Sequence, residues 1–163
     1  MIRPLTVDDA DELAALYRAN REYLAPFEPT RSNEFFTAAD QRRRLAYRGD
    51  DRVRFAILDG GAIAGTVNVN DILRGALQLG NIGYWVDRKR AGRGLASAAL
   101  AEVVEFAFGE LGLHRLEAGT LPDNFASQRV LEKNGFERFG YATKLLLIAG
   151  EWRDHILFER VVD

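Results

Sequence analysis

The stretch that decides the fold is residues 83–95, Gly83-Tyr84-Trp85-Val86-Asp87-Arg88-Lys89-Arg90-Ala91-Gly92-Arg93-Gly94-Leu95. It predicts a strand, then a basic turn punctuated by glycines, and then the start of a long amphipathic helix. Glycines let the backbone approach a ligand closely, and the first N–H groups of a helix lack internal partners and favour negative charge. This order of elements therefore predicts an anion-binding cradle, and the expected ligand is a phosphate or pyrophosphate.

Positive charge is concentrated at this cradle. Arg88, Lys89, Arg90 and Arg93 lie within it, whereas the whole chain carries a formal net charge of −2. Nucleic-acid binding usually leaves a basic footprint over a whole domain, so a small anionic ligand is favoured and no nucleic-acid partner is expected. At 163 residues, with 47% hydrophobic and 28% charged residues, the chain is expected to form one globular domain over residues 1–163.

Several classes of protein are disfavoured by what the sequence lacks. There is no cysteine and there are two distant histidines, so disulfides, thiolate metal sites and a cysteine nucleophile are excluded, and no metal site is expected. Acidic residues stand near the N-terminus where a signal peptide would need an apolar core, and the apolar run 145–149 is too short to span a membrane. We therefore expect a cytoplasmic protein without a membrane partner, as a monomer or homodimer.

Hydrophobic periodicity and turn residues predict alternating strands and helices outward from the cradle. Two prolines make residues 25–30 irregular, and the arginine run 42–44 is interpreted as a solvated helix face. The expected strands are 2–5, a hairpin of 53–59 and 63–70, 77–86, 113–121, and two within 136–162; the expected helices begin at Thr6, Thr37, Leu95 and Asn124, with a turn at 71–75.

Known phosphate loops do not explain the cradle well. A Walker A loop needs Gly-x-x-x-x-Gly-Lys-Ser/Thr, and no such string occurs. A dinucleotide fingerprint needs Gly-x-Gly-x-x-Gly; Gly92 and Gly94 supply its first pair, but position 97 is serine. That fingerprint also requires an early βαβ unit, whereas the first strands here have an antiparallel pattern.

The segment Lys89-Arg90-Ala91-Gly92-Arg93-Gly94 instead resembles the acetyl-CoA loop of the GNAT superfamily, Gln/Arg-x-x-Gly-x-Gly/Ala, with lysine as its one departure. The phrase 81–85, the block 124–136 and the late segment 150–155 resemble the RimJ/RimL-type branch of that superfamily in order and spacing. The resemblance implies an α/β fold of the GNAT type. Its mixed, mostly antiparallel sheet is flanked by helices, and its fourth and fifth strands splay apart.

The same resemblance implies acetyl-CoA as co-substrate and assigns its contacts. Backbone groups around Trp85 and Val86 are expected to hold the pantetheine arm, and main-chain N–H groups from Arg90 to Leu95 the pyrophosphate, with Arg88, Lys89 and Arg93 as candidates for added charge. The backbone N–H near Val86 is a candidate oxyanion contact. The expected acid for the departing thiolate is Ser127, and Asn124 is expected to cap the following helix or contact the pantetheine.

A general base is harder to assign. Relatives place glutamate where this chain has Asn81, or a carboxylate where it has the apolar Leu146. Because an α-amine has a pKa near 8, it needs less help than a lysine side chain, so the missing base favours an α-amine acceptor. Glu34, Asn68 and Asn81 are candidates for contacts with the acceptor.

The sequence thus predicts an acetyl-CoA-dependent N-acetyltransferase that acts by direct transfer. A protein N-terminus, for example that of a ribosomal protein, is the first expected acceptor. A small amine such as an aminoglycoside, polyamine or amino acid is the second, and a non-catalytic acyl-CoA sensor on the same fold is a third interpretation.

Overall fold

The computed structural model describes residues 1–162. These residues form seven strands, five α-helices and three short 3₁₀ turns. The strands are β1 (Ile2–Pro4), β2 (Val53–Asp59), β3 (Ala62–Leu73), β4 (Leu79–Val86), β5 (Arg115–Thr120), β6 (Glu137–Ile148) and β7 (Glu151–Val161). The helices are α1 (Ala10–Ala19), α2 (Arg21–Leu24), α3 (Ala38–Leu45), α4 (Leu95–Gly109) and α5 (Phe125–Lys133). The 3₁₀ turns are η1 (Val7–Asp9), η2 (Asn33–Phe36) and η3 (Arg88–Arg90).

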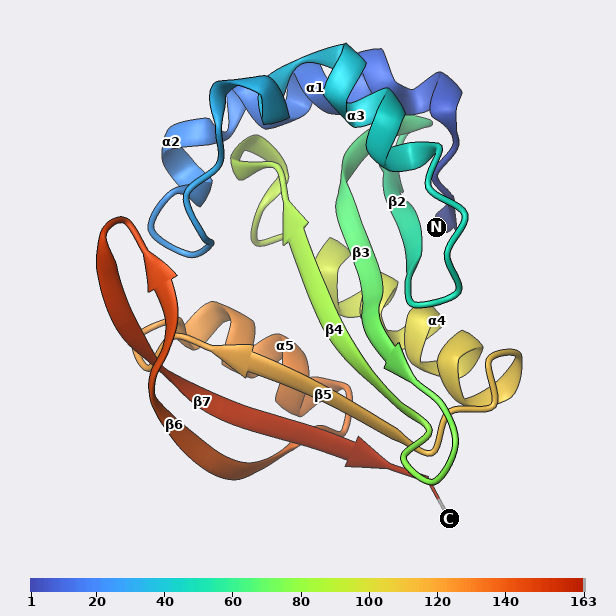
Figure 1. Cartoon of the computed structure of the whole chain (residues 1–163), viewed down its shortest axis with the longest axis vertical. Helices are drawn as coiled ribbons and strands as arrows, with labels where there is room; N and C mark the ends of the chain where they lie inside the picture. Colours follow the sequence, from blue (N-terminus) through green and yellow to red (C-terminus); the bar gives the residue numbers. More distant parts are fainter. Residues whose placement is uncertain (163) are drawn as a thin grey trace.

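All seven strands belong to one open sheet in the order β1-β2-β3-β4-β5-β7-β6. Only β4 and β5 pair in parallel, and their register covers three positions, from Leu79↔Arg115 to Asn81↔Glu117. Beyond Asn81 the two strands separate, and Figure 1 shows them pulling apart toward their ends. The expected mixed sheet with splayed fourth and fifth strands is therefore confirmed.

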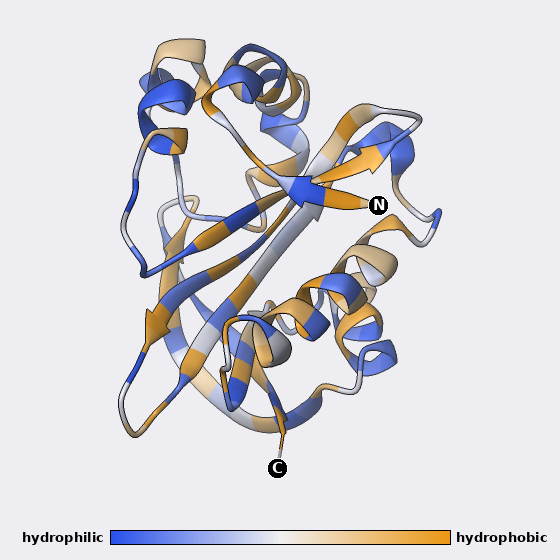
Figure 2. Ribbon diagram, turned by 90° about the vertical axis from the view of Figure 1, so that its right-hand side faces the viewer, coloured by the Kyte–Doolittle hydropathy of each residue, from blue (hydrophilic) through white to orange (hydrophobic). Residues whose placement is uncertain are grey.

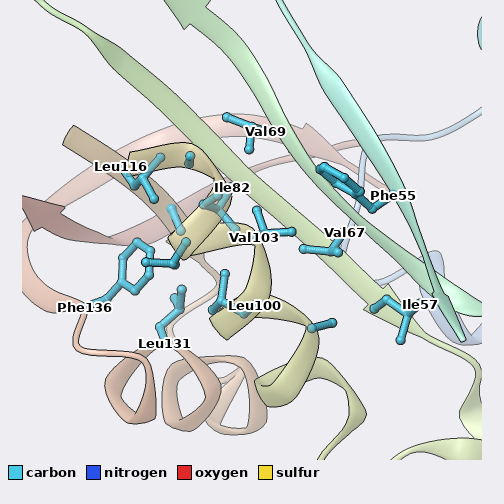
Figure 3. Packing of buried hydrophobic residues seen from close by; sticks show 14 of the residues in the cluster. Phe55, Ile57, Val67, Val69, Ile82, Leu100, Val103, Leu116, Leu131 and Phe136 are labelled. Carbon is cyan, nitrogen blue, oxygen red and sulfur yellow. The ribbon is translucent and has the colours of Figure 1, made fainter. Parts of the chain in front are cut away.

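The hydrophobic core lies between the sheet and helices α4 and α5. Apolar and polar residues alternate along the strands in Figure 2, so that one face of the sheet is apolar. Figure 3 shows Val67, Ile82, Leu100, Val103 and Leu131 packed in this layer. Helices α1 and α3 pack over the other face at the top of Figure 1, where Leu13 and Leu45 form a smaller cluster. No helix of residues 1–162 is both long and apolar enough to cross a bilayer.

The turn between β3 and β4 differs from expectation. A turn was expected over 71–75, but β3 continues to Leu73 and β4 begins only at Leu79. The pairing register shifts between Asn70 and Leu73, and Asp71 has a φ of 48°. A bulge of this kind absorbs an extra residue without ending the strand, which a pattern of turn-forming residues cannot reveal.

The N-terminal cap at Asp9 leads to a stability prediction. Asp9 is buried, accepts hydrogen bonds from both Nη atoms of Arg3 at 2.8 and 2.7 Å, and accepts the Thr6 N–H at 2.8 Å. Arg3 is the main reason that the pKa of Asp9 lies below its ordinary value of 3.8. A lowered folded-state pKa stabilises the fold above the unfolded pKa, and this stabilisation disappears as the pH falls through the folded value.

Asp9→Asn is therefore expected to lower the free energy of unfolding by about 1–3 kcal/mol at pH 7. The difference from the wild type should shrink as the pH falls below 3.8. Urea denaturation at a series of pH values measures both effects. Asp8→Asn, which removes the neighbouring exposed carboxylate, is the control. A difference that stays constant down to pH 3 would contradict the role of the ion pair.

Candidate functional site

A cavity of about 420 Å³ lies where β4 and β5 separate. Its walls come from the end of β4, the turn before α4, the first turn of α4, helix α5, and helix α2 with the residues after it. The lining residues are Tyr23, Leu24, Phe27, Tyr84, Trp85, Val86, Arg90, Ala91, Gly92, Gly94, Leu95, Ala96, Ser97, Asn124, Ala126, Ser127, Arg129, Val130 and Lys133. The structure thus brings most of the expected donor-binding residues into one cleft.

The glycine turn leaves a short row of main-chain donors at one end of this cleft. Gly92 and Gly94 have φ values of 75° and 79°, a left-handed conformation that favours glycine. The N–H groups of Gly92, Arg93 and Gly94 make no hydrogen bond within residues 1–162. Gly94 is also the N-cap of the 15-residue helix α4. Free N–H groups at the start of a long helix are well suited to an anion.

The expected row of N–H groups from Arg90 to Leu95 is longer than the free one. The Arg90 N–H donates to the Asp87 carbonyl at 2.8 Å, and the Ala91 N–H donates to the Arg88 carbonyl at 3.3 Å. Both are used inside the 3₁₀ turn. The donors available to a ligand therefore begin at Gly92.

The basic side chains of the turn are less available than their number suggests. Arg93 pairs with Asp59 at 2.7 Å, and Arg90 lies 3.9 Å from the same carboxylate. Arg88 and Lys89 are exposed and do not line the cleft. Instead, Arg129 and Lys133 on α5 line it. The sequence analysis missed these two, although their spacing of four residues puts them on one helix face.

The free edge of β4 exposes its backbone to the cleft. The Asp87 N–H donates to the Ala64 carbonyl of β3 at 2.7 Å. Because neighbouring residues of a strand direct their main-chain groups to opposite edges, the groups of Tyr84 and Val86 are directed toward β5, and those of Trp85 toward β3. The expected backbone contact at Val86 has suitable geometry, whereas Trp85 can contribute only its side chain.

Trp85 belongs to an aromatic cluster under α1. Its Nε1–H donates to the Tyr17 hydroxyl at 3.2 Å, and the two rings lie 4.8 Å apart. Tyr17 in turn meets the buried Phe35 edge to face, also at 4.8 Å. This cluster holds the end of β4 against the N-terminal helices, and thereby fixes the position of one wall of the cleft.

Ser127 faces β4 rather than open solvent. Its hydroxyl oxygen lies 2.8 Å from the Tyr84 hydroxyl, which also donates to the Ser127 carbonyl at 3.1 Å. Burial raises the pKa of Tyr84 to about 12, so its proton is retained at neutral pH. Asn124 caps α5, as expected, by accepting the Ser127 N–H at 3.2 Å. Tyr84 is therefore a site residue that the sequence analysis left out.

The face of the sheet opposite α4 carries the expected acceptor residues Asn68 and Asn81. Both are half-buried, and the Oδ1 atom of Asn68 is buried without a hydrogen-bond partner among the described residues. Asn81 lies in register with Glu117 of β5, a half-buried carboxylate that binds the Arg115 guanidinium at 2.6 Å. Leu146 is exposed on β6. Glu117 is thus a carboxylate near Asn81 that the sequence alone did not reveal.

The expected acceptor residue Glu34 is less well placed than Glu28, for which the sequence analysis expected no role. Glu34 is exposed on η2 and does not line the cleft. Glu28 is half-buried and follows the cleft residue Phe27. Burial raises the pKa of Glu28 above its ordinary value, and Arg31 partly opposes this shift. Because Glu28 forms no hydrogen bond within residues 1–162, it is better suited than Glu34 to meet a cationic amine.

Comparisons with known proteins identify the family. A family model described as an acetyltransferase (GNAT) domain matches residues 1–137, and the chain belongs to this family. It is 40% identical over 161 residues to the probable N-acetyltransferase YjcK of Bacillus subtilis, covering 94% of this chain and 89% of that protein. The protein is an N-acetyltransferase.

Two solved structures are similar over almost the whole chain. The ribosomal-protein-S5-alanine acetyltransferase of Vibrio fischeri has a TM-score of 0.95 and 34% identity, with 99% of this chain and 92% of that chain covered. Mycobacterium smegmatis RimJ in complex with CoA-disulfide has a TM-score of 0.92 and 31% identity, with 99% and 81% covered. These neighbours bear out the expected RimJ/RimL-type branch.

Proposed function

We propose that the protein transfers an acetyl group from acetyl-CoA to the α-amine of a protein N-terminus, in one ternary complex. The observation that carries the donor assignment is the single cleft that joins the free N–H groups after Ala91, the free edge of β4 and the Ser127 hydroxyl. A pyrophosphate, an extended arm and a thiol end need these three features in this order.

The chain's own groups have distinct tasks in this proposal. Acetyl-CoA supplies a thioester whose carbonyl carbon forms the new bond to the amine nitrogen while its bond to sulfur breaks. The Val86 N–H stabilises negative charge on the carbonyl oxygen, because a backbone donor aimed at that oxygen is already oriented. Ser127 gives its proton to the leaving sulfur and regains one from the proton that the attacking nitrogen loses as the amide forms. The Tyr84 hydroxyl, which donates to the Ser127 carbonyl, lies 2.8 Å from the Ser127 Oγ and so fixes the position of the serine hydroxyl.

The acceptor side supports an amine that needs little activation. An α-amine is about one tenth neutral at pH 7, whereas a lysine amine is almost wholly charged. The nearby carboxylates are the salt-bridged Glu117 and the half-buried Glu28. The name of the Vibrio fischeri neighbour, a ribosomal-protein-S5-alanine acetyltransferase, also points to a protein N-terminus.

A panel of acceptors tests this proposal directly. Free thiol release from acetyl-CoA is measured with N-terminal peptides, the same peptides blocked at the N-terminus but carrying lysine, and small amines. We expect turnover on free N-termini that depends on the first residue. Fast acetylation of lysine peptides alone would refute the α-amine. Turnover only on small amines would replace the acceptor class, and tight CoA binding with no turnover would indicate a sensor.

A further inference from the structure

A second cavity, of about 170 Å³, lies among the end of α3, β1 and the start of β2. Four of its nine lining residues are arginines: Arg44, Arg48, Arg52 and Arg54, beside Pro4, Leu5, Leu45, Tyr47 and Val53. We call it the arginine hollow. Phe55 and Ile57 of β2 pack into the main core, so the alternating Arg54 lies on the opposite face of the sheet. The hollow is separate from the cleft at the β4–β5 separation.

Positive charge exceeds negative charge around the arginine hollow. Arg44 pairs with Asp40 at 2.6 Å, and Arg52 pairs with Asp51 at 2.9 Å. Asp40 also pairs with Arg43, which lies outside the hollow. Arg48 donates to main-chain carbonyls, and Arg54 pairs with no carboxylate among the described residues. Arg48 and Arg54 are therefore the two guanidinium groups of the hollow that form no ion pair within residues 1–162.

The hollow also has hydrogen-bond donors without acceptors. The Arg52 Nε is buried and unpaired. The half-buried Arg54 guanidinium makes no hydrogen bond to residues 1–162. Burial lowers the pKa of Arg54, and the neighbouring Arg52, Arg44 and Arg31 lower it further. These surroundings disfavour the charged form of the Arg54 guanidinium. A bound anion would offset the repulsion between the arginines and would accept hydrogen bonds from the unpaired donors.

We propose that the arginine hollow binds one small oxyanion, a carboxylate or phosphate group. The planar fork of an arginine matches two oxygens of such a group, and the guanidinium is charged at all relevant pH values. The donors that would hold the anion are those of Arg48, Arg52 and Arg54. None of the roles proposed above for acetyl transfer involves the arginine hollow.

The oxyanion can come from two sources. Arg54, Asn68 and Gly83 lie in register across β2, β3 and β4. At about 4.8 Å per strand, the hollow begins roughly 10 Å from the strand that borders the cleft. An acidic side chain close to the acceptor's N-terminus spans such a distance, and this source rests on the proposed function. A free anion in solution is the other source.

Inorganic phosphate tests the site without any turnover. Its effect on Tm is compared with that of chloride at equal ionic strength, with CoA present so that the glycine turn is occupied. At about tenfold excess over its dissociation constant, phosphate should raise Tm by about 3–6 °C. Arg48→Ala combined with Arg54→Gln should abolish this rise. Arg42→Ala, a change at an exposed position of α3 outside the hollow, should keep it.

The proposal is overturned if phosphate and chloride act alike on the wild type, or if the double variant keeps the full response. If the double variant does not fold, Arg54→Lys keeps the charge without the fork and should weaken phosphate binding at least threefold; unchanged binding would contradict the site. Peptide acceptors with glutamate or glutamine at positions two and three then identify the source. If the glutamate peptides have a lower KM than the glutamine peptides, and Arg54→Gln removes this difference, the anion belongs to the acceptor. Equal KM values for the two sets of peptides assign the anion to solution.

Discussion

Replacing Ser127 with alanine is expected to lower kcat about a hundredfold, with a change of less than about threefold in the dissociation constant of CoA. The reason is that the proposed role of Ser127 is to protonate the leaving sulfur, which matters only once the thioester bond breaks. Its hydroxyl lies 2.8 Å from the Tyr84 hydroxyl and lines the cleft, so it is held in place rather than free to rotate.

Steady-state kinetics and CoA titration of the same preparations measure the two effects. Ser97→Ala is a matched control, because Ser97 lines the same cleft but its hydroxyl accepts from Asn134 at 3.1 Å. Tyr84→Phe keeps the ring and removes only the hydroxyl, and should lower kcat by about tenfold through the orientation of Ser127. The acid role is refuted if Ser127→Ala weakens CoA binding more than it lowers kcat.

Gly94→Val is expected to weaken CoA binding about thirtyfold, or roughly 2 kcal/mol. Gly94 has a φ of 79° and caps α4, and a β-branched residue rarely adopts such a backbone. The turn must change conformation, which moves the free N–H groups of residues 92–94 away from their common direction. No atom of residues 1–162 lies within 4 Å of a Cβ at this position, so the loss would not arise from a clash with the described fold.

Gly75→Val is the matched control for this strain. Gly75 has a φ of 71° and equally open surroundings, but it lies in the β3–β4 connection, outside the cleft. Both variants should lose similar stability in thermal denaturation, whereas only Gly94→Val should lose CoA affinity in isothermal titration. Equal CoA affinity in the two variants would show that the glycine turn does not hold the pyrophosphate.

The features that local sequence encodes were predicted well. The order of strand, glycine turn and helix in 83–95, the Asn124 cap and the final hairpin all depend on residues within a few positions of each other. The pairing of Arg93 with Asp59 joins residues that lie 34 positions apart, and the contact of Tyr84 with Ser127 joins residues 43 apart. No local pattern specifies such pairs, because the sheet order brings them together.

The residues considered for the acceptor site show this limit of sequence-based prediction more clearly. Glu34 and Glu28 have the same chemistry and similar sequence surroundings, yet only Glu28 is half-buried. The interpretation of residues 42–44 as a solvated helix face holds for Arg42 and Arg43, whereas Arg44 is half-buried and lines the arginine hollow. Burial of a loop carboxylate or of one arginine in a run depends on how η2 and α3 pack over the sheet, which periodicity does not report.

The free edge of β4 has a consequence for how such proteins diverge. If the donor arm is held by the main-chain groups of Tyr84 and Val86, a substitution cannot remove those contacts unless it changes the path of the strand. Mutations can therefore accumulate on the face of β3 and β4 opposite α4, at positions such as Asn68 and Asn81, without loss of the donor. A fold with an unchanged donor site can then acquire specificity for new acceptors one substitution at a time, with acetyl transfer preserved at every intermediate step.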